Sequence, residues 1–300
     1  MRYLWAGLGL VGAFVVTYWV AVRTATGQRW ENAALAGRAG ASPEALQTAQ
    51  DRLDQFTVTM LAASIVVLVV IGLVRRRVLL GLAAAGVVVG SLALAEVLKR
   101  VVLTRPALVT APGDITDNSF PSGHTTIAMA LMVAAVLVVP YALRPLTALV
   151  VAAWGVGVSG YTVTAGWHRV SDTIGADLLV LGVACGAALV LDRLGRSTDA
   201  VPTDRARAVL RSLLVAPIAV IAAVGLGVGT LLGAYSWHQL DDPGVEPEAA
   251  DHNAFLAAQS LAVGASAAAI VALLVLLHHT TLDRQPSADS AESAVSAEST

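Results

Sequence analysis

The sequence is poor in charge, in cysteine and in lysine. Only 13% of its 300 residues are charged, whereas 56% are hydrophobic, and the formal net charge is -2. A net charge so close to zero offers no basic surface for nucleic acid, so no nucleic-acid partner is expected. The one cysteine, Cys185, lies in an apolar run, which excludes an internal disulfide framework and a thiolate metal site. The mean hydropathy of +0.72 is typical of a membrane protein.

Eight apolar stretches approach or reach the roughly 17–25 residues that a helix needs to cross a bilayer. The first runs unbroken from Leu4 to Val22 and exceeds the core of a typical signal peptide, so we expect an uncleaved anchor. Glycines at every second position from Gly225 to Gly229 indicate close helix packing rather than a nucleotide-binding loop. The eight stretches are residues 4–22, 57–74, 78–98, 125–140, 146–164, 173–191, 212–234 and 255–278. The sequence therefore predicts an all-α, polytopic membrane helical bundle.

Four segments are expected along the chain. Residues 1–56 hold the first transmembrane helix and an outer loop, in which Ser42 begins a short amphipathic helix. Residues 57–191 complete a six-helix core with that first helix, and residues 192–282 hold about two additional transmembrane helices. Residues 283–300 are rich in Ser, Ala and Glu and too polar to pack, so we expect them to be disordered.

The basic residues favour one orientation in the membrane. With the N-terminus in the cytoplasm, eleven basic residues fall on the inner face and eight on the outer face, and the run Arg75-Arg76-Arg77 lies in a very short inner loop. Cytoplasmic loops carry an excess of Arg and Lys. This orientation places the histidine motifs described below on the outside. We therefore expect a multi-pass plasma-membrane protein with its site on the extracytoplasmic face.

Lysine occurs once, at Lys99, in a chain whose other eighteen basic residues are arginine. Lys99 lies at the outer end of the third apolar stretch, next to Arg100, and Arg105 follows a few positions later. Such a cluster is either a snorkelling group that marks the membrane boundary or a site for phosphate, whose charge several cations must offset. The histidines nearby favour the phosphate site.

The string Pro121-Ser122-Gly123-His124 has the form of a turn that leads into the fourth apolar stretch. Gly123 permits close approach of the backbone, and Ser122 can cap the helix or donate to an oxygen. The free amides at a helix start suit an anion. His124 is either the acid of a phosphoryl-transfer site or a residue that only caps the helix.

His168 and Asp172 lie four positions apart at the start of the sixth stretch, a spacing that suits a histidine oriented by a carboxylate. The carboxylate would fix the tautomer, leave the other ring nitrogen free to attack, and stabilise the imidazolium that results. A boundary histidine followed by a helix-capping Asp is the alternative. Two histidines and a basic cluster at one membrane face favour a phosphatase, with one histidine as nucleophile and the other as acid.

These residues resemble the type 2 phosphatidic acid phosphatase/haloperoxidase superfamily, in its membrane lipid phosphatase branch. That family shows three blocks over a region like residues 57–191: a Lys followed by Arg-Pro, then Pro-Ser-Gly-His, then Ser-Arg leading to His and, four positions later, Asp. The resemblance implies that His168 is a nucleophile that forms a phosphohistidine, with Asp172 as its partner and His124 as general acid. It also implies that no metal or other cofactor is needed, and that the phosphoryl oxygens are held by Lys99, Arg105, Ser122 and Gly123.

Two departures from the family pattern affect the phosphate site. The spacing from Lys99 to Arg105 is one residue shorter than usual, and Tyr161-Thr162 stands where the family has Ser-Arg. A phosphate-binding arginine is thus missing from the third block. Arg169, directly after the proposed nucleophile, is the expected replacement, with Arg100 as the alternative.

The expected reaction is hydrolysis of a phosphate monoester or diphosphate of a lipid, polyprenyl or phosphatidic acid-like, drawn from the bilayer. The missing arginine keeps a second possibility open, a catalytically weak or inactive protein that binds or translocates lipid phosphate. A vanadate-dependent haloperoxidase would share the superfamily site, but the apolar spans fit a lipid enzyme better. A generic transporter is a weaker alternative because no broken helix pairs or inverted halves are visible.

Overall fold

The computed structural model describes residues 1–110, 117–199 and 204–282, and within them the chain is almost entirely helical. Two-residue strands, β1 (Thr198–Asp199) and β2 (Thr280–Thr281), form one antiparallel pair. The helices are α1 (Arg2–Thr17), α2 (Ala25–Gly37), α3 (Pro43–Leu53), α4 (Val58–Val74), α5 (Val78–Val97), α6 (Gly123–Val138), α7 (Arg144–Thr164), α8 (Val170–Arg193), α9 (Arg205–Gln239) and α10 (Pro247–Leu276). Short π-helical turns extend α1 over Tyr18–Val22 and α5 over Leu98–Val102. The predicted all-α class is confirmed.

Six helices of the described residues are long and apolar enough to cross a membrane, namely α1, α5, α7, α8, α9 and α10. A seventh candidate span is the pair α3 and α4, which is bent by 55° at a short break. The fourth predicted stretch, residues 125–140, forms α6, which has only 16 residues and lies inside the bundle. The chain is therefore a multi-pass membrane protein.

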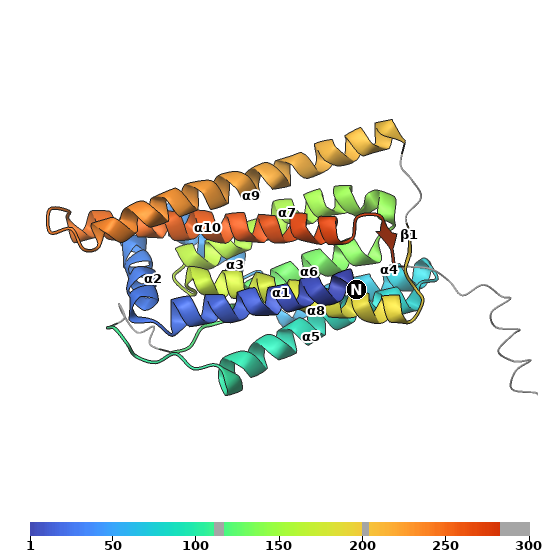
Figure 1. The fold of residues 1–300 in the computed structure, drawn as a ribbon, viewed down its shortest axis with the longest axis horizontal. Helices are drawn as coiled ribbons and strands as arrows, with labels where there is room; N and C mark the ends of the chain where they lie inside the picture. The colour runs from blue at the N-terminus through green and yellow to red at the C-terminus, as the bar shows by residue number, and fades with distance from the viewer. Residues whose placement is uncertain (111–116, 200–203, 283–300) are drawn as a thin grey trace, which may run out of the picture.

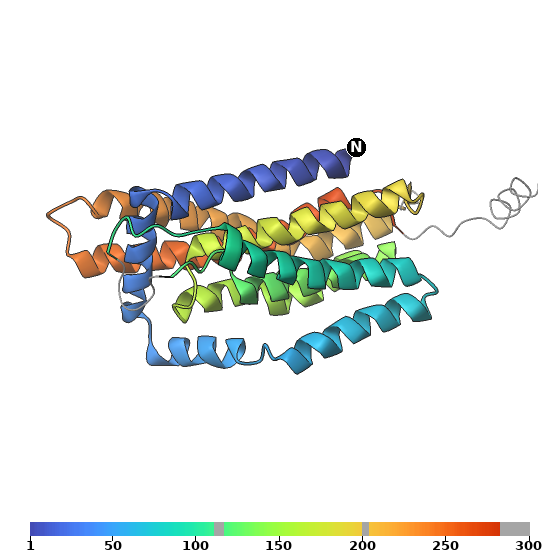
Figure 2. The same ribbon diagram turned by 90° about the horizontal axis from the view of Figure 1, so that it is seen from below.

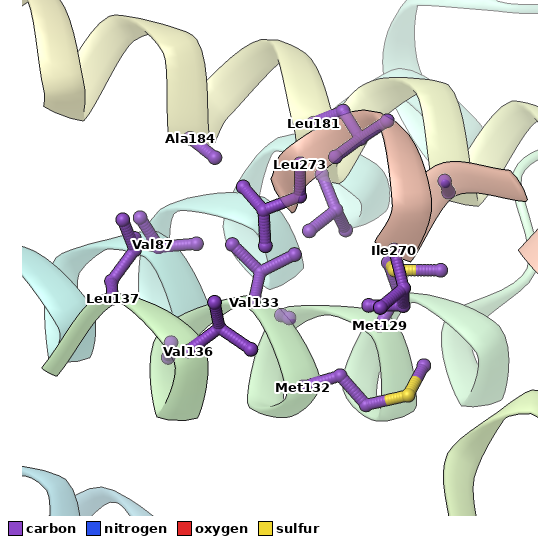
Figure 3. Packing of buried hydrophobic residues seen from close by; sticks show 14 of the residues in the cluster. Val87, Met129, Met132, Val133, Val136, Leu137, Leu181, Ala184, Ile270 and Leu273 are labelled. Atoms are coloured by element: carbon purple, nitrogen blue, oxygen red, sulfur yellow. The ribbon is translucent and has the colours of Figure 1, made fainter. Parts of the chain in front are cut away.

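The helix α6 forms the centre of the hydrophobic core. Figure 3 shows its side chains, such as Met129, Val133 and Leu137, packed against residues of α5, α8 and α10. Most of its residues are buried, so no broad polar face interrupts the packing. Because α10 takes part in this core, it is packed into the bundle with the helices of residues 57–191.

Glycines set the closest contacts between neighbouring helices. A Cβ added to Gly225 would lie 2.7 Å from the Cα of Gly264, and one added to Gly229 would lie 2.7 Å from Leu261 Cγ. Any larger side chain at either position would push α9 away from α10. The glycine run in α9 thus serves helix packing, as predicted.

Different elements of the chain lie at the two ends of the bundle. The long helices run along the long axis of the molecule, and α2 crosses one end of it (Figures 1 and 2). The π-helical end of α5 and the starts of α6 and α8 lie at this same end, which we call the site end. The N-terminus, the turn of Arg75–Arg77 and the β1–β2 pair lie at the opposite end. The segment expected as an outer loop contains two helices, α2 and α3, and Ser42 caps α3 as predicted.

Candidate active site

Three stretches of the chain bring the predicted functional residues to the site end. Lys99 lies in the π-helical end of α5, His124 in the first turn of α6, and His168 just before α8. The backbone N–H of Ser122 donates to the backbone oxygen of Asp172 at 2.9 Å, which joins the start of α6 to the start of α8. The blocks that are far apart in the sequence therefore form one site.

The two histidines face each other across this site. Their ring centroids lie 6.5 Å apart. The His124 ring also packs against Trp167, at 5.1 Å, and edge-on against Phe56, at 5.7 Å. The separation allows both imidazoles to contact a single phosphoryl group, one from each side.

The carboxylate of Asp172 is fully buried and anchors the start of α8. Its Oδ2 lies 3.3 Å from His168 Nδ1, and it accepts hydrogen bonds from Ser119 Oγ at 2.6 Å and from the Arg169 backbone N–H at 2.9 Å. Because Nδ1 of His168 is held by this carboxylate, Nε2 is the nitrogen left to attack an electrophile. The expected pairing of His168 with Asp172 is present.

Lys99 points toward the start of α6. A Cβ added to Gly123 would lie 3.9 Å from Lys99 Nζ, so the ammonium group sits beside the backbone of the helix start. The Lys99 side chain is 18% exposed and lies 3.8 Å from Glu96, which also pairs with Arg100. Ser122 is buried and its Oγ accepts from the Thr125 N–H, so its side chain serves here as the helix cap. Lys99 and the first amides of α6 thus form the open cationic side of the site.

Asn118 fixes the backbone around Lys99. Its side-chain amide donates to the backbone oxygens of Lys99 at 3.1 Å and of Leu103 at 3.0 Å. These bonds satisfy carbonyls at the end of α5 that the helix itself leaves without a partner. Asn118 and Ser119 could not be singled out from the sequence, because both lie in a short polar string without a recognisable spacing.

Arg105 is buried and pairs with Glu31 of α2. Its Nη1 lies 3.6 Å from Glu31 Oε2, and the two side chains are 5% and 2% exposed. Glu31 Oε1 accepts the backbone N–H of Ser171 at 3.0 Å. Burial, with the nearby charge of Asp172, raises the pKa of Glu31 to about 7, against the opposing effects of Ser171 and Arg105. Arg105 therefore lies near the start of α8, in contact with a carboxylate that the sequence did not point to.

Arg169 is also buried and is held by α2. Its Nε and Nη2 donate to Asn32 Oδ1 at 3.4 and 3.2 Å. Burial, with the nearby charge of Arg105, lowers the pKa of Arg169 from its ordinary value. Arg100, by contrast, is 77% exposed and bonds to Glu96 at 2.6 Å. Of the two arginines considered as replacements for the missing one, Arg169 is the one that lies beside the site.

Thr162 occupies the position where the resemblance leads us to expect an arginine. Its side chain is buried, and its backbone oxygen accepts the N–H groups of Trp167 and His168 at 3.0 and 3.2 Å. The position therefore shapes the turn that presents His168. It contributes no positive charge to the site.

Three residues of α2 were missed by sequence reasoning, Gln28, Glu31 and Asn32. Gln28 lies about one helical turn before the adjacent pair Glu31 and Asn32, and the three side chains bond to the 104–110 segment and to the start of α8. Their spacing in a polar segment was a signal for one helix face, but nothing in the sequence identified what that face contacts.

The described residues contain no group of three or more His, Cys, Asp or Glu side chains placed to hold a metal ion.

The family model described as the PAP2 superfamily matches residues 76–197, which include Lys99, both histidines and Asp172. Residues 76–197 are thus a PAP2 superfamily segment of the chain. Its PAP2 segment supports a phosphatase, as members of this superfamily generally are. Neither the curated proteins nor the solved structures gave a match.

The PAP2 segment does not include α2. The match begins at residue 76, whereas Glu31 and Asn32 lie far upstream of it. The side chains that contact Arg105 and Arg169 therefore come from a part of the chain to which the PAP2 match does not extend.

Proposed function

We propose that this PAP2 protein is a metal-independent lipid phosphatase that hydrolyses a phosphate monoester or diphosphate at the outer face of the plasma membrane. The observation that carries the proposal is the pair of facing imidazoles, His124 and His168, with a buried carboxylate on one of them and Lys99 beside them. Such a set supplies a nucleophile, an acid and a charge for the phosphate in one place.

The proposed reaction has two steps. Nε2 of His168 attacks the phosphorus, the bond from phosphorus to the leaving oxygen breaks, and His124 gives its proton to that oxygen. Water then attacks the phosphohistidine and gives a proton to His124, and the bond from phosphorus to nitrogen breaks to release phosphate. Asp172 stabilises the charge that His168 gains in the first step.

The position of the site supports an amphiphilic substrate. The histidines lie where apolar helices begin, at the end of the bundle, so a headgroup can reach Lys99 while its chain stays in the bilayer. Polyprenyl phosphates, polyprenyl diphosphates and phosphatidic acid-like lipids share this chemistry.

The test is release of inorganic phosphate from a panel of these lipids by the purified protein in detergent with EDTA. We expect turnover that EDTA leaves intact, that orthovanadate inhibits, and that His168→Ala and His124→Ala reduce by about 100-fold or more. His252→Ala, a histidine of α10 remote from this pair in the sequence, is the control and should retain activity. Undiminished hydrolysis by His168→Ala would refute the nucleophile, and loss of activity with EDTA would indicate a metal mechanism.

The absence of an arginine at Thr162 favours one alternative, a protein that binds or translocates lipid phosphate with little turnover. This alternative leaves the paired His124 and His168 without a role, so we rank it second. Binding of lipid phosphate without release of inorganic phosphate, in the same assay, would favour it.

A further inference from the structure

The helix α2 lies across the site end and reaches the arginines of the site from outside the PAP2 segment (Figure 1). Its buried polar residues are aimed at that site rather than at solvent. Glu31 and Asn32 are adjacent in the sequence, and each bonds to a different arginine. Two buried arginines are thus held by two neighbouring side chains of one helix.

Glu31 connects Arg105 to the start of α8. One carboxylate oxygen lies 3.6 Å from Arg105 Nη1 and the other accepts the Ser171 N–H at 3.0 Å. A buried arginine without a carboxylate would be costly, because an uncompensated charge in the protein interior is strongly destabilising. Among the described residues Arg105 Nη2 has no hydrogen-bond partner, so the guanidinium keeps donor capacity beyond its contact with Glu31.

Asn32 fixes the second arginine. Its Oδ1 accepts from Nε and Nη2 of Arg169, and its Nδ2 donates to the Thr110 backbone oxygen at 3.2 Å. The side chain therefore spans from α8 to the segment that follows Arg105. Asn32 thus contacts the guanidinium of Arg169 through a neutral amide oxygen, which does not cancel the positive charge of the arginine.

We propose that α2 is the positioning element of the phosphate site, in which Glu31 orients Arg105 and Asn32 orients Arg169 so that the two guanidinium groups bind the phosphoryl oxygens in place of the arginine absent at Thr162. The role of these two residues rests on the proposed function. Neither Glu31 nor Asn32 touches the substrate in this arrangement. They act through the arginines.

The charge of Glu31 should also tune how strongly the site binds an anion. The charged groups that face it are Arg105, Arg169 and Asp172. The charged groups of α10 near α2, Glu248, Asp251 and His252, lie beside its other end at residues 36–40. With a pKa of about 7, Glu31 is neutral in mildly acidic solution and leaves the charge of Arg105 available to phosphate. As the pH rises through this value, the carboxylate ionises, pairs with Arg105 and repels a bound anion.

The experiment measures orthovanadate binding by thermal stabilisation of the full-length protein in detergent, beside lipid phosphate hydrolysis, from pH 6 to pH 8.5. Comparison of Glu31→Gln with the wild type at each pH cancels the titration of vanadate and of the histidines. We expect equal affinities near pH 6 and a dissociation constant about three- to tenfold lower for Glu31→Gln near pH 8. Asn32→Ala should weaken vanadate binding by about tenfold at every pH. The control, Glu44→Gln, removes an exposed carboxylate of α3 and should match the wild type.

Vanadate affinities of Glu31→Ala and Asn32→Ala that match that of the wild type would overturn the proposal, and so would vanadate that fails to bind the wild type. Glu31→Ala removes both contacts, and its defect should be rescued largely by Glu31→Gln, which keeps an oxygen for the Ser171 N–H. If hydrolysis is absent but vanadate binding shows the expected dependence on Glu31, the proposed function fails and the positioning role stands. If hydrolysis is present and the Glu31 and Asn32 variants behave as wild type, the proposed function stands and the positioning role fails.

Discussion

Asp172 contacts both the proposed nucleophile and the start of a helix. One of its oxygens faces His168 Nδ1, Ser119 Oγ and the Arg169 N–H. The carboxylate therefore orients His168 and stabilises the first turn of α8 at the same time, so that the proposed chemistry and the local fold depend on one residue.

Substitution Asp172→Asn should reduce kcat by about 100- to 10,000-fold while KM changes little. The amide keeps the shape of the side chain, but it neither stabilises an imidazolium nor offers the same oxygen to three donors. The measurement is steady-state hydrolysis of a lipid phosphate. Ser119→Ala removes only one donor and is the matched control, with a smaller loss expected. An Asp172→Asn enzyme with normal kcat would show that His168 needs no carboxylate.

At this scale the sequence singles out the histidines, Asp172 and Lys99, because each lies in a short motif or is unusual in composition. The contacts of Glu31 and Asn32 were not predictable. Their partners Arg105, Arg169 and Ser171 lie between 74 and 140 positions away in the chain. Only the three-dimensional arrangement of α2 against the PAP2 segment brings them together.

At the scale of elements, a polar cluster joins three helices inside the apolar bundle. Ser266 of α10 donates to Asp177 of α8 at 2.8 Å, and its hydroxyl lies 2.6 Å from that of Ser159 on α7. All three side chains are buried. Polar side chains inside membrane bundles face their partners rather than lipid, so the cluster fixes how α10 docks on the PAP2 helices.

Substitution Ser266→Ala should lower the free energy of unfolding by about 1 kcal/mol, within a range of roughly 0.6 to 3 kcal/mol, because it leaves Asp177 without its donor. Thermal unfolding in detergent measures the change. Ser260→Ala is the control on the same helix, since Ser260 bonds only to the backbone oxygen of Leu256 and little change is expected. Equal effects of the two substitutions would show that the cluster does not hold α10.

Helices were easier to predict than their packing. The apolar stretches predict the long helices up to α8 to within a few residues, because hydrophobic length determines a span. The helices α9 and α10 begin at Arg205 and Pro247, well before the predicted stretches 212–234 and 255–278, because each helix continues into polar sequence. The sequence marked the last two spans as an addition to the core. It could not show that α10 packs into the centre beside α6, since both helices are apolar on most faces and periodicity carries no information about neighbours.

For the whole molecule, the two ends carry different chemistry. The histidines lie at the site end, and the turn of Arg75–Arg77 lies at the other. The starts of α7 and α9 and the end of α8 bring further arginines to that second end. This distribution agrees with the excess of positive charge that cytoplasmic ends carry, and it supports the proposed outward orientation of the site.

Cysteine labelling in intact cells tests this orientation. In a Cys185→Ala background, Glu44→Cys at the site end should react with a membrane-impermeant maleimide from outside. Ala206→Cys, in the exposed first turn of α9 at the opposite end, should react only after permeabilisation. The parent Cys185→Ala protein is the blank. Labelling of Ala206→Cys alone in intact cells would reverse the topology and move the reaction to the cytoplasmic leaflet.

The packing of Lys99 against Gly123 has a practical consequence. No other side chain in the sequence carries a primary amine, and this one lies beside the first turn of α6. A lysine-directed affinity label, or selective isotopic enrichment of lysine, would therefore give one side-chain signal, and it would come from the proposed phosphate site. The chain thus contains its own spectroscopic reporter for occupancy of that site.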